Sequence, residues 1–233
     1  MIRLLVMLCL LASPALAQSH CRQALALGLD VSGSVDQREY RLQLDGLAAA
    51  LNSAPVREVL LAPSSAPVRI AIFEWSGPRD QYLIVPWREI TDEAALIGVI
   101  SALAATTRRP AQPTTALGPA ILTGLGLLDQ QPACWKRTLD ISGDGKANTG
   151  TRPQDISDHR FPAGITINGL VIGHNNPGFD LQIGELSAYY QSYVVRGPDA
   201  FVETALGFED YEAAMTRKLL RELASVAIGS LSP

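Results

Sequence analysis

The sequence has few aromatic residues, few cysteines and no excess of basic charge. Aromatic side chains make up 6% of its 233 residues while aliphatic side chains dominate, which favours a fold of mixed helices and strands over an all-β fold. Acidic residues outnumber basic ones by 23 to 19 and no basic stripe occurs, so we expect no nucleic-acid partner. No Asn-x-Ser/Thr sequon occurs either, which fits a protein exported by a bacterium.

Long apolar runs are missing as well. The first run, Leu4 to Leu11, is too short to cross a bilayer, and no later stretch is long and apolar enough to do so. Arg3 precedes this run and Ala15-Leu16-Ala17 follows it, which is the pattern of a secretory signal peptide. We therefore expect a signal peptide over residues 1–17, a single domain over 18–233, and a periplasmic or secreted mature protein without a membrane span.

The motifs of several enzyme classes are absent. Gly-x-Ser-x-Gly does not surround Ser32, Ser34 or Ser142, and no Gly-x-Gly-x-x-Gly follows the first predicted strand. A haloacid-dehalogenase-like phosphatase with Asp30 as its nucleophile would need a second acid at position 32. We therefore expect a protein without enzymatic activity, and a Mg²⁺-dependent hydrolase or phosphatase is the alternative.

A short apolar stretch, Leu25 to Leu29, ends abruptly in an acid and two hydroxyls. Such a run predicts a strand buried on both faces, as in a parallel sheet, with its ligands beyond the carboxyl end. Asp30, Ser32 and Ser34 alternate along the chain, so an extended backbone can point all three to one side. One carboxylate and two hydroxyls suit a hard cation such as Mg²⁺. The alternative role of Ser34 is to cap a helix, with Gln37 completing the capping box.

Strands and helices alternate along the rest of the chain. This order predicts an α/β fold, a doubly wound and mostly parallel sheet with helices on both faces. The link between 68–73 and 81–86 is too short for a parallel crossover, which makes 81–86 an antiparallel edge strand. The expected strands are 25–30, 68–73, 81–86, 138–141, 165–172 and 193–195, and the expected helices are 40–51, 91–103, 117–128, 154–160, 181–190 and 208–226.

Two later segments place further oxygen atoms beside predicted strands and helices. Thr115 precedes a helix that carries Gly118 and Ile121, and Asp144 follows a strand within a glycine-rich turn. Thr115 could instead be a helix N-cap. Thr114 is a near alternative to Thr115 as a ligand.

Asp30-x-Ser32-x-Ser34, then Thr115 and then Asp144-Gly145 resemble the metal-ion-dependent adhesion site (MIDAS) of von Willebrand factor type A domains. The chain looks most like exported bacterial proteins of unknown function that carry this domain alone. The resemblance implies that Ser32 and Ser34 coordinate Mg²⁺ directly, that Thr115 does so directly or through water, and that Asp30 and Asp144 hold coordinated waters or that one ligates directly. Mn²⁺ or Ca²⁺ could replace Mg²⁺.

The resemblance also implies a function. In the family, an Asp or Glu of a partner protein fills the open metal position, so we expect an adhesion-type, protein-binding module. A vestigial site with a purely structural metal is the other alternative. The exposed rim of the site is expected at Glu74 to Gly77 and at Arg108-Arg109. In the family a glycine pair usually precedes the threonine, whereas here the preceding residues are Gln112-Pro113-Thr114.

Asp140 lies inside a supposedly buried strand, where a charge needs a partner. It could support the metal ligands or form half of a buried ion pair, and the pair is favoured. Cys21 and Cys134 are the cysteines outside the leader, and two cysteines in an exported protein suggest one disulfide. In the resembled fold their strands are parallel neighbours, which implies that the two residues lie together at the end of the sheet away from the metal.

Overall fold

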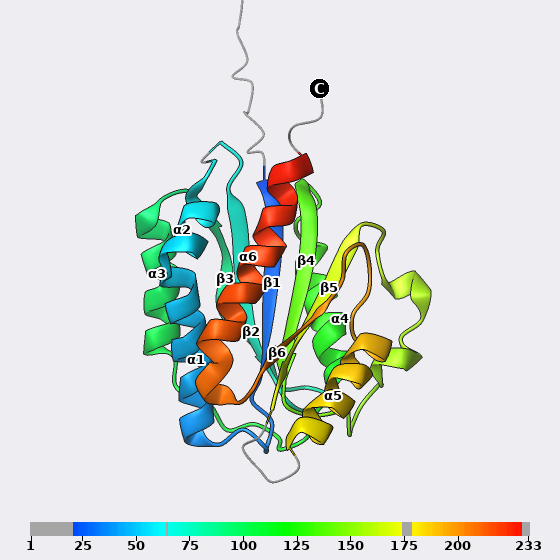
Figure 1. Cartoon of the computed structure of the whole chain (residues 1–233). Helices are drawn as coiled ribbons and strands as arrows, with labels where there is room; N and C mark the ends of the chain where they lie inside the picture. The colour runs from blue at the N-terminus through cyan, green and yellow to red at the C-terminus, as the bar shows by residue number, and fades with distance from the viewer. Residues whose placement is uncertain (1–20, 64, 174–178, 230–233) are drawn as a thin grey trace, which may run out of the picture.

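The computed structural model describes residues 21–63, 65–173 and 179–229, without the side chains of 179–180 and 225–229. The predicted signal peptide, residues 1–17, lies outside this part of the chain. The described strands form one sheet in the order β3-β2-β1-β4-β5-β6, with only β3 antiparallel to its neighbour (Figure 1). The expected α/β architecture, including the antiparallel edge strand, is therefore confirmed. The strands are β1 (Cys21–Asp30), β2 (Val68–Trp75), β3 (Gln81–Ile90), β4 (Cys134–Gly143), β5 (Ile165–Ile172) and β6 (Val202–Ala205).

Helices cover both faces of the sheet because the central strands are apolar on both faces. In β1, Leu25, Leu27 and Leu29 pack with one group of helices, whereas Ala24 and Ala26 pack with the other. The first group is α1 (Gln37–Asn52), α2 (Ala54–Leu61), α3 (Glu93–Ala105) and α6 (Tyr211–Gly229), and the second is α4 (Leu117–Leu128) and α5 (Phe179–Tyr193).

Two expected elements differ from the structure, and one helix is additional. Residues 193–195 do not form the last strand, because α5 continues to Tyr193 and the edge strand is β6. The helix α2 was not expected; it begins at Ala54, separated from the end of α1 by Ser53 alone, and carries Pro55 in its first turn, where proline is tolerated. Residues 154–160 are two 3₁₀ turns, Pro153–Asp155 and Asp158–Arg160, instead of one helix.

The expected disulfide joins Cys21 and Cys134. These residues are register partners at the start of the parallel strands β1 and β4, with their Cα atoms 4.4 Å apart. The bond links positions 113 residues apart in the sequence. It therefore fixes the two central strands to each other at the end of the sheet where both begin.

We expect the Cys21→Ser/Cys134→Ser variant to be less stable than the wild type by about 2–4 kcal/mol, because the unfolded chain regains the freedom that the crosslink removes. Urea unfolding with and without a reductant measures the loss. The reductant should lower the wild-type midpoint to that of the variant and leave the variant unchanged. A wild-type midpoint that does not respond to full reduction would contradict this expectation.

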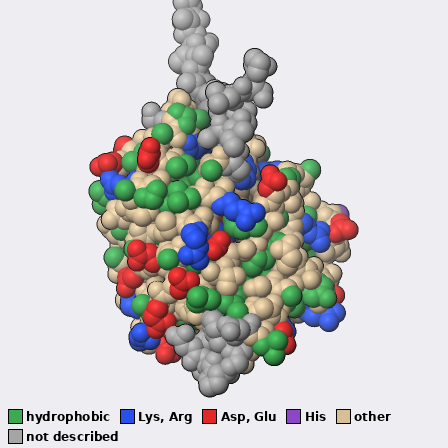
Figure 2. All heavy atoms as spheres, viewed as in Figure 1, with side chains coloured by type: hydrophobic (Ala, Val, Ile, Leu, Met, Phe, Trp, Pro, Cys, Tyr) green, Lys and Arg blue, Asp and Glu red, His purple; other side chains and the backbone are tan. Residues whose placement is uncertain are grey.

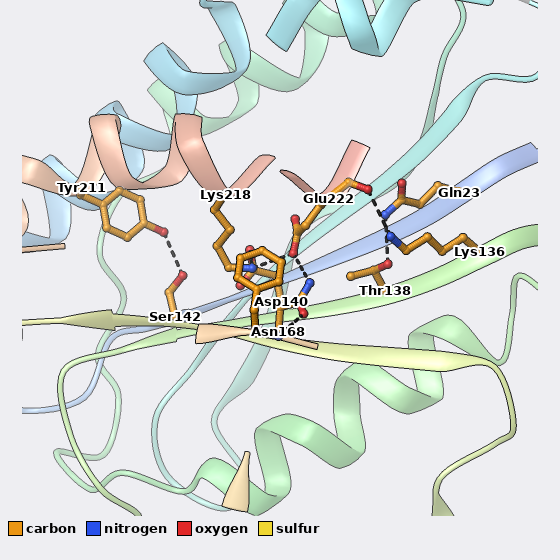
Figure 3. A network of polar contacts seen from close by, with 10 residues as sticks. Gln23, Lys136, Thr138, Asp140, Ser142, Asn168, Tyr211, Lys218 and Glu222 are labelled. Carbon is orange, nitrogen blue, oxygen red and sulfur yellow. Dashed lines mark hydrogen bonds and ion pairs between the residues drawn. The ribbon is translucent and has the colours of Figure 1, made fainter. Parts of the chain in front are cut away.

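Polar side chains lie between the sheet and α6, where an apolar contact is usual. The Lys218 ammonium on α6 is 3.0 Å from Asp140 Oδ2 on β4 and 2.6 Å from Glu222 Oε1, and all three side chains are buried (Figure 3). Asn168 on β5 donates a hydrogen bond of 2.6 Å to the same Glu222 oxygen. Asp140 is therefore part of a buried ion network, as favoured from the sequence.

One ammonium cannot fully neutralise two buried carboxylates. Burial raises the pKa of Asp140 to about 7, although the Lys218 charge lowers it. Burial lowers the pKa of Lys218, but the charges of Asp140 and Glu222 outweigh it, and the net pKa is raised. Lys218 is therefore positively charged, in the layer between α6 and the sheet.

The outer surface over α1 and α6 has no dominant charge. Figure 2 shows basic and acidic side chains interspersed on this face, with apolar side chains between them. In the described part of the chain, no helix combines the length and apolarity needed to cross a membrane.

Candidate metal centre

The predicted ligands meet at one edge of the sheet. β1 and β4 are parallel neighbours, so Asp30 at the end of β1 and Asp144 just after β4 lie at the same edge, the lower one in Figure 1. Thr115 comes from the loop before α4. Topology thus brings together residues more than a hundred positions apart in the sequence.

Hydrogen bonds connect the five residues directly. The Ser34 hydroxyl donates to Asp144 Oδ1 at 2.7 Å, and the Ser32 backbone N–H donates to Asp30 Oδ1 at 2.8 Å. The Ser32 and Ser34 hydroxyl oxygens are 3.3 Å apart, and the Thr115 hydroxyl lies 3.4 Å from that of Ser32. Three hydroxyls and two carboxylates therefore face a common point.

Neither the Ser34 nor the Thr115 hydroxyl caps a helix, which was the alternative role considered for each. Asp36, with Glu39, forms the capping box of α1, so Ser34 is not its cap. Ala116 is the N-cap residue of α4, and no side chain caps that helix, so the Thr115 hydroxyl does not serve as a cap. Both hydroxyls are available to a ligand at the sheet edge.

The two carboxylates of the site, Asp30 and Asp144, lie close enough for their negative charges to repel each other. Asp30 is fully buried, and its Oδ2 has no hydrogen-bond partner among the described residues. Burial and the nearby Asp144 charge raise the pKa of Asp30 to about 8. A bound cation would offset both effects, and hydroxyl and carboxylate oxygens are the donors that Mg²⁺ takes. The residues present therefore fit the metal that the sequence pattern implies.

Exposure differs between the predicted ligands. Ser34 is exposed, whereas Ser32 is buried and Thr115 and Asp144 are nearly so. The site therefore opens to solvent on the Ser34 side. No group of three or more His, Cys, Asp or Glu side chains suited to a metal occurs in the described ranges.

Residues not identified from the sequence hold the ligands in place. Asn148 accepts a hydrogen bond of 2.8 Å from the Thr115 N–H and donates its own N–H to the Thr115 carbonyl at 3.0 Å. Gln43 on α1 donates to the Asp30 carbonyl at 2.9 Å. A Cβ on Gly143 would lie 2.5 Å from the Tyr190 hydroxyl and 3.0 Å from Asp30 Oδ2, so the glycine admits both groups. The sequence hinted at the role of Asn148 only through its position, four residues after the predicted ligand Asp144.

The expected rim is only partly correct. Glu74 to Gly77 are buried instead of exposed, because β2 continues to Trp75 and the Glu74 carboxylate accepts a hydrogen bond of 2.5 Å from the Tyr40 hydroxyl. Arg108 is half-buried and Arg109 is exposed. The loop that carries these arginines is therefore the part of the expected rim that reaches solvent.

Solved structures with this fold include von Willebrand factor type A proteins. Proximal thread matrix protein 1 from the mussel byssus, solved with a zinc-occupied MIDAS motif, aligns over 88% of this chain and 48% of its own, with a TM-score of 0.62 and 15% identity. The von Willebrand factor type A protein from Catenulispora acidiphila aligns over 88% of this chain and 43% of its own, with a TM-score of 0.57 and 14% identity. The chain thus spans less than half of either protein.

A third structure is similar over nearly its whole length. The aerotolerance-related membrane protein from Bacteroides fragilis aligns over 85% of this chain and 98% of its own, with a TM-score of 0.55 and 12% identity. At these identities the similarity shows the fold, which is that of a von Willebrand factor type A domain.

A family model also matches the sequence. The model of the family described as "Protein of unknown function (DUF1194)" matches residues 20–227. No curated protein matches the chain.

Proposed function

The chain belongs to the family described as "Protein of unknown function (DUF1194)" and has a von Willebrand factor type A fold, and from this premise we propose that it is an exported, metal-dependent protein-binding module. Asp30, Ser32, Ser34, Thr115 and Asp144 would hold a divalent cation, Mg²⁺ in the first instance. An Asp or Glu of a partner protein would complete its coordination.

The observation that carries this proposal is the arrangement of three hydroxyls that cap no helix around two carboxylates at the sheet edge. Neutral hydroxyls leave a bound cation short of negative charge. Such a cation attracts an external carboxylate, which it would bind as a Lewis acid. The exposed Ser34 side of the site leaves room for a protein surface.

The chain's own residues have defined tasks in such a site. Asn148 orients Thr115 by accepting its N–H with the side-chain oxygen and donating its own backbone N–H to the Thr115 carbonyl, and Gln43 fixes the end of β1 through the Asp30 carbonyl. The buried environment of Asp30 makes its unpaired oxygen a strong acceptor for a cation or for a water bound to one. These contacts set the positions of the ligands before a partner arrives.

We expect the binding of exported partner proteins to depend on the metal. The measurement is a pull-down from the exported protein fraction with the immobilised wild type, in Mg²⁺ or Mn²⁺, in EDTA, and after the metal is restored. The Thr115→Ala and Asp144→Ala variants should lose most of the captured material. Thr114→Ala is the matched control, because the Thr114 hydroxyl makes no hydrogen bond within the described residues.

Two outcomes would contradict the proposed function. Partners captured equally well in EDTA would be using another surface. Partners lost with Thr114→Ala but retained with Thr115→Ala would show that the ligand set is wrong.

A further inference from the structure

The loop formed by residues 108–113 lies against the candidate metal centre. The Arg108 guanidinium donates hydrogen bonds to the carbonyls of Val31 and Ser32, at 3.3 and 3.2 Å. The Gly33 N–H donates to the Pro113 carbonyl at 3.0 Å, and a Cβ on Gly33 would lie only 2.7 Å from the Pro113 Cβ. Both ends of the loop are therefore fixed to the segment that carries Ser32 and Ser34.

Arg109 is held in the same loop as an exposed cation. Its guanidinium lies over the Tyr82 ring, 3.6 Å from the ring centroid, which restrains its orientation. Within the described residues it makes no ion pair or hydrogen bond. Of the two acids nearby, Glu74 is buried and accepts a hydrogen bond from the Tyr40 hydroxyl; burial raises its pKa, and the Arg109 charge, which acts on it only at a distance, lowers it. The other acid, Asp80, accepts the Gln112 N–H at 3.1 Å. The planar donor edge of Arg109 is thus available to an external group.

A hollow of about 300 Å³ lies between this loop and the segment that carries Ser32. It is lined by Ser32 and Gly33 on one side and by the loop, including Arg108 and Arg109, on the other. Its volume is at the lower end of the range of small-ligand pockets, which suits one or two side chains of a bound segment. A segment that reaches the metal centre from its exposed Ser34 side and extends along this hollow meets Arg109.

From this juxtaposition we infer that the partner's binding segment carries two carboxylates, one for the metal and a second for Arg109. The inference rests on the proposed function and specifies the partner as an acidic segment. The guanidinium fork of arginine matches a carboxylate with two parallel hydrogen bonds, whereas a lysine offers only a point charge. Arg109 is therefore a specificity-determining residue beside the metal ligands.

Short synthetic peptides of Gly and Ser with defined acids test this inference. One peptide carries a single Asp, a second set carries two Asp residues separated by one, two or three positions, and a third set replaces the second Asp with Asn. Dissociation constants are measured by NMR titration in saturating Mg²⁺ and in EDTA. We expect at least one two-Asp peptide to bind the wild type about 5-fold more tightly than its Asp/Asn partner, as for an exposed ion pair of about 1 kcal/mol.

The variants separate Arg109 from a general charge effect. Arg109→Gln should abolish the gain from the second Asp, so that each two-Asp peptide and its Asp/Asn partner bind with the same affinity. Arg79→Gln removes the same charge from an exposed side chain outside this hollow and should keep the gain. A gain that survives Arg109→Gln, or that Arg79→Gln removes equally, would overturn the inference.

The same titrations distinguish this inference from the proposed function. Mg²⁺-dependent binding of the single-Asp peptide with no gain from any second Asp would overturn the role of Arg109 alone. Binding of every peptide equally well in EDTA, or no Mg²⁺-dependent binding of any peptide, would overturn the proposed function and the inference with it.

Discussion

The Ser32→Ala/Ser34→Ala variant is expected to bind Mg²⁺ at least about 100-fold more weakly than the wild type. Loss of residues that only support a metal ligand costs about 10–100-fold in affinity, and this variant removes two oxygens proposed to touch the metal. The alanines keep the backbone N–H that Ser32 donates to Asp30. Isothermal titration calorimetry measures the affinity directly, and the stabilisation of the folded state by added Mg²⁺ should disappear in parallel.

The matched control for this variant is Ser101→Ala. Ser101 is an exposed residue of α3, a helix that contributes none of the five candidate ligands, so its loss should leave Mg²⁺ binding intact. Asp30→Ala is a poorer probe, because the buried carboxylate also affects the stability of the fold. Wild-type affinity in the double variant would show that the metal does not bind at these serines.

Lys218→Met should destabilise the protein by about 3–5 kcal/mol. Methionine is of similar length, so the main change is that Asp140 and Glu222 lose the ammonium that lies 3.0 and 2.6 Å away. Removing one partner from a buried ion network leaves uncompensated charge in a medium that solvates it poorly. Urea unfolding at pH 7 measures the loss. A variant within about 1 kcal/mol of the wild type would show that water reaches the network.

The loss from Lys218→Met should also shrink as the pH falls. The pKa of Asp140 is already about 7 in the folded state, and removal of the cation raises it further. Between the unfolded-state carboxyl pKa of about 4 and the raised pKa of Asp140, the folded variant binds more protons than the unfolded chain. The stability of the variant therefore falls as the pH rises from about 4 towards the raised pKa. We therefore expect a smaller deficit at pH 5 than at pH 7. The Asp140→Asn/Lys218→Met/Glu222→Gln variant, which carries none of these charges, is the control and should show neither the full deficit nor this pH dependence.

The sequence contained enough information for most of the fold. An apolar run that ends in Asp30 predicts a doubly covered strand, and the short link before Gln81 requires an antiparallel neighbour. The strand β6 was missed because Val202–Ala205 is only four residues long and mixes polar with apolar side chains. The helix α2 was missed because Pro55, which follows the end of α1, is also allowed in the first turn of a new helix.

The candidate site was predicted only at the level of which segments meet. Parallel strands bring Asp30 and Asp144 to one edge, and alternation places Ser32 and Ser34 beside them. The contacts of Asn148 and Tyr190 depend on the directions of side chains in loops and across the sheet, and the pattern of apolar residues along the sequence does not predict these directions. Lys218 and Glu222 are four residues apart on a helix, a spacing that usually indicates an exposed pair. Their burial depends on which face of α6 meets the polar residues of β4.

The pairing of Cys21 with Cys134 has a consequence for the route by which the protein folds. β1 and β4 are neighbours at the centre of the sheet but 113 residues apart in the chain, and contacts of such long sequence separation make folding slow. Once the crosslink forms, the search for this pairing becomes local, since the ends of the long loop are already together. Oxidation before folding should therefore speed the assembly of the central strands, and with them the far edge where the carboxylates and hydroxyls converge. The refolding rates of the oxidised and reduced chains would show whether the disulfide accelerates folding or only stabilises the folded state.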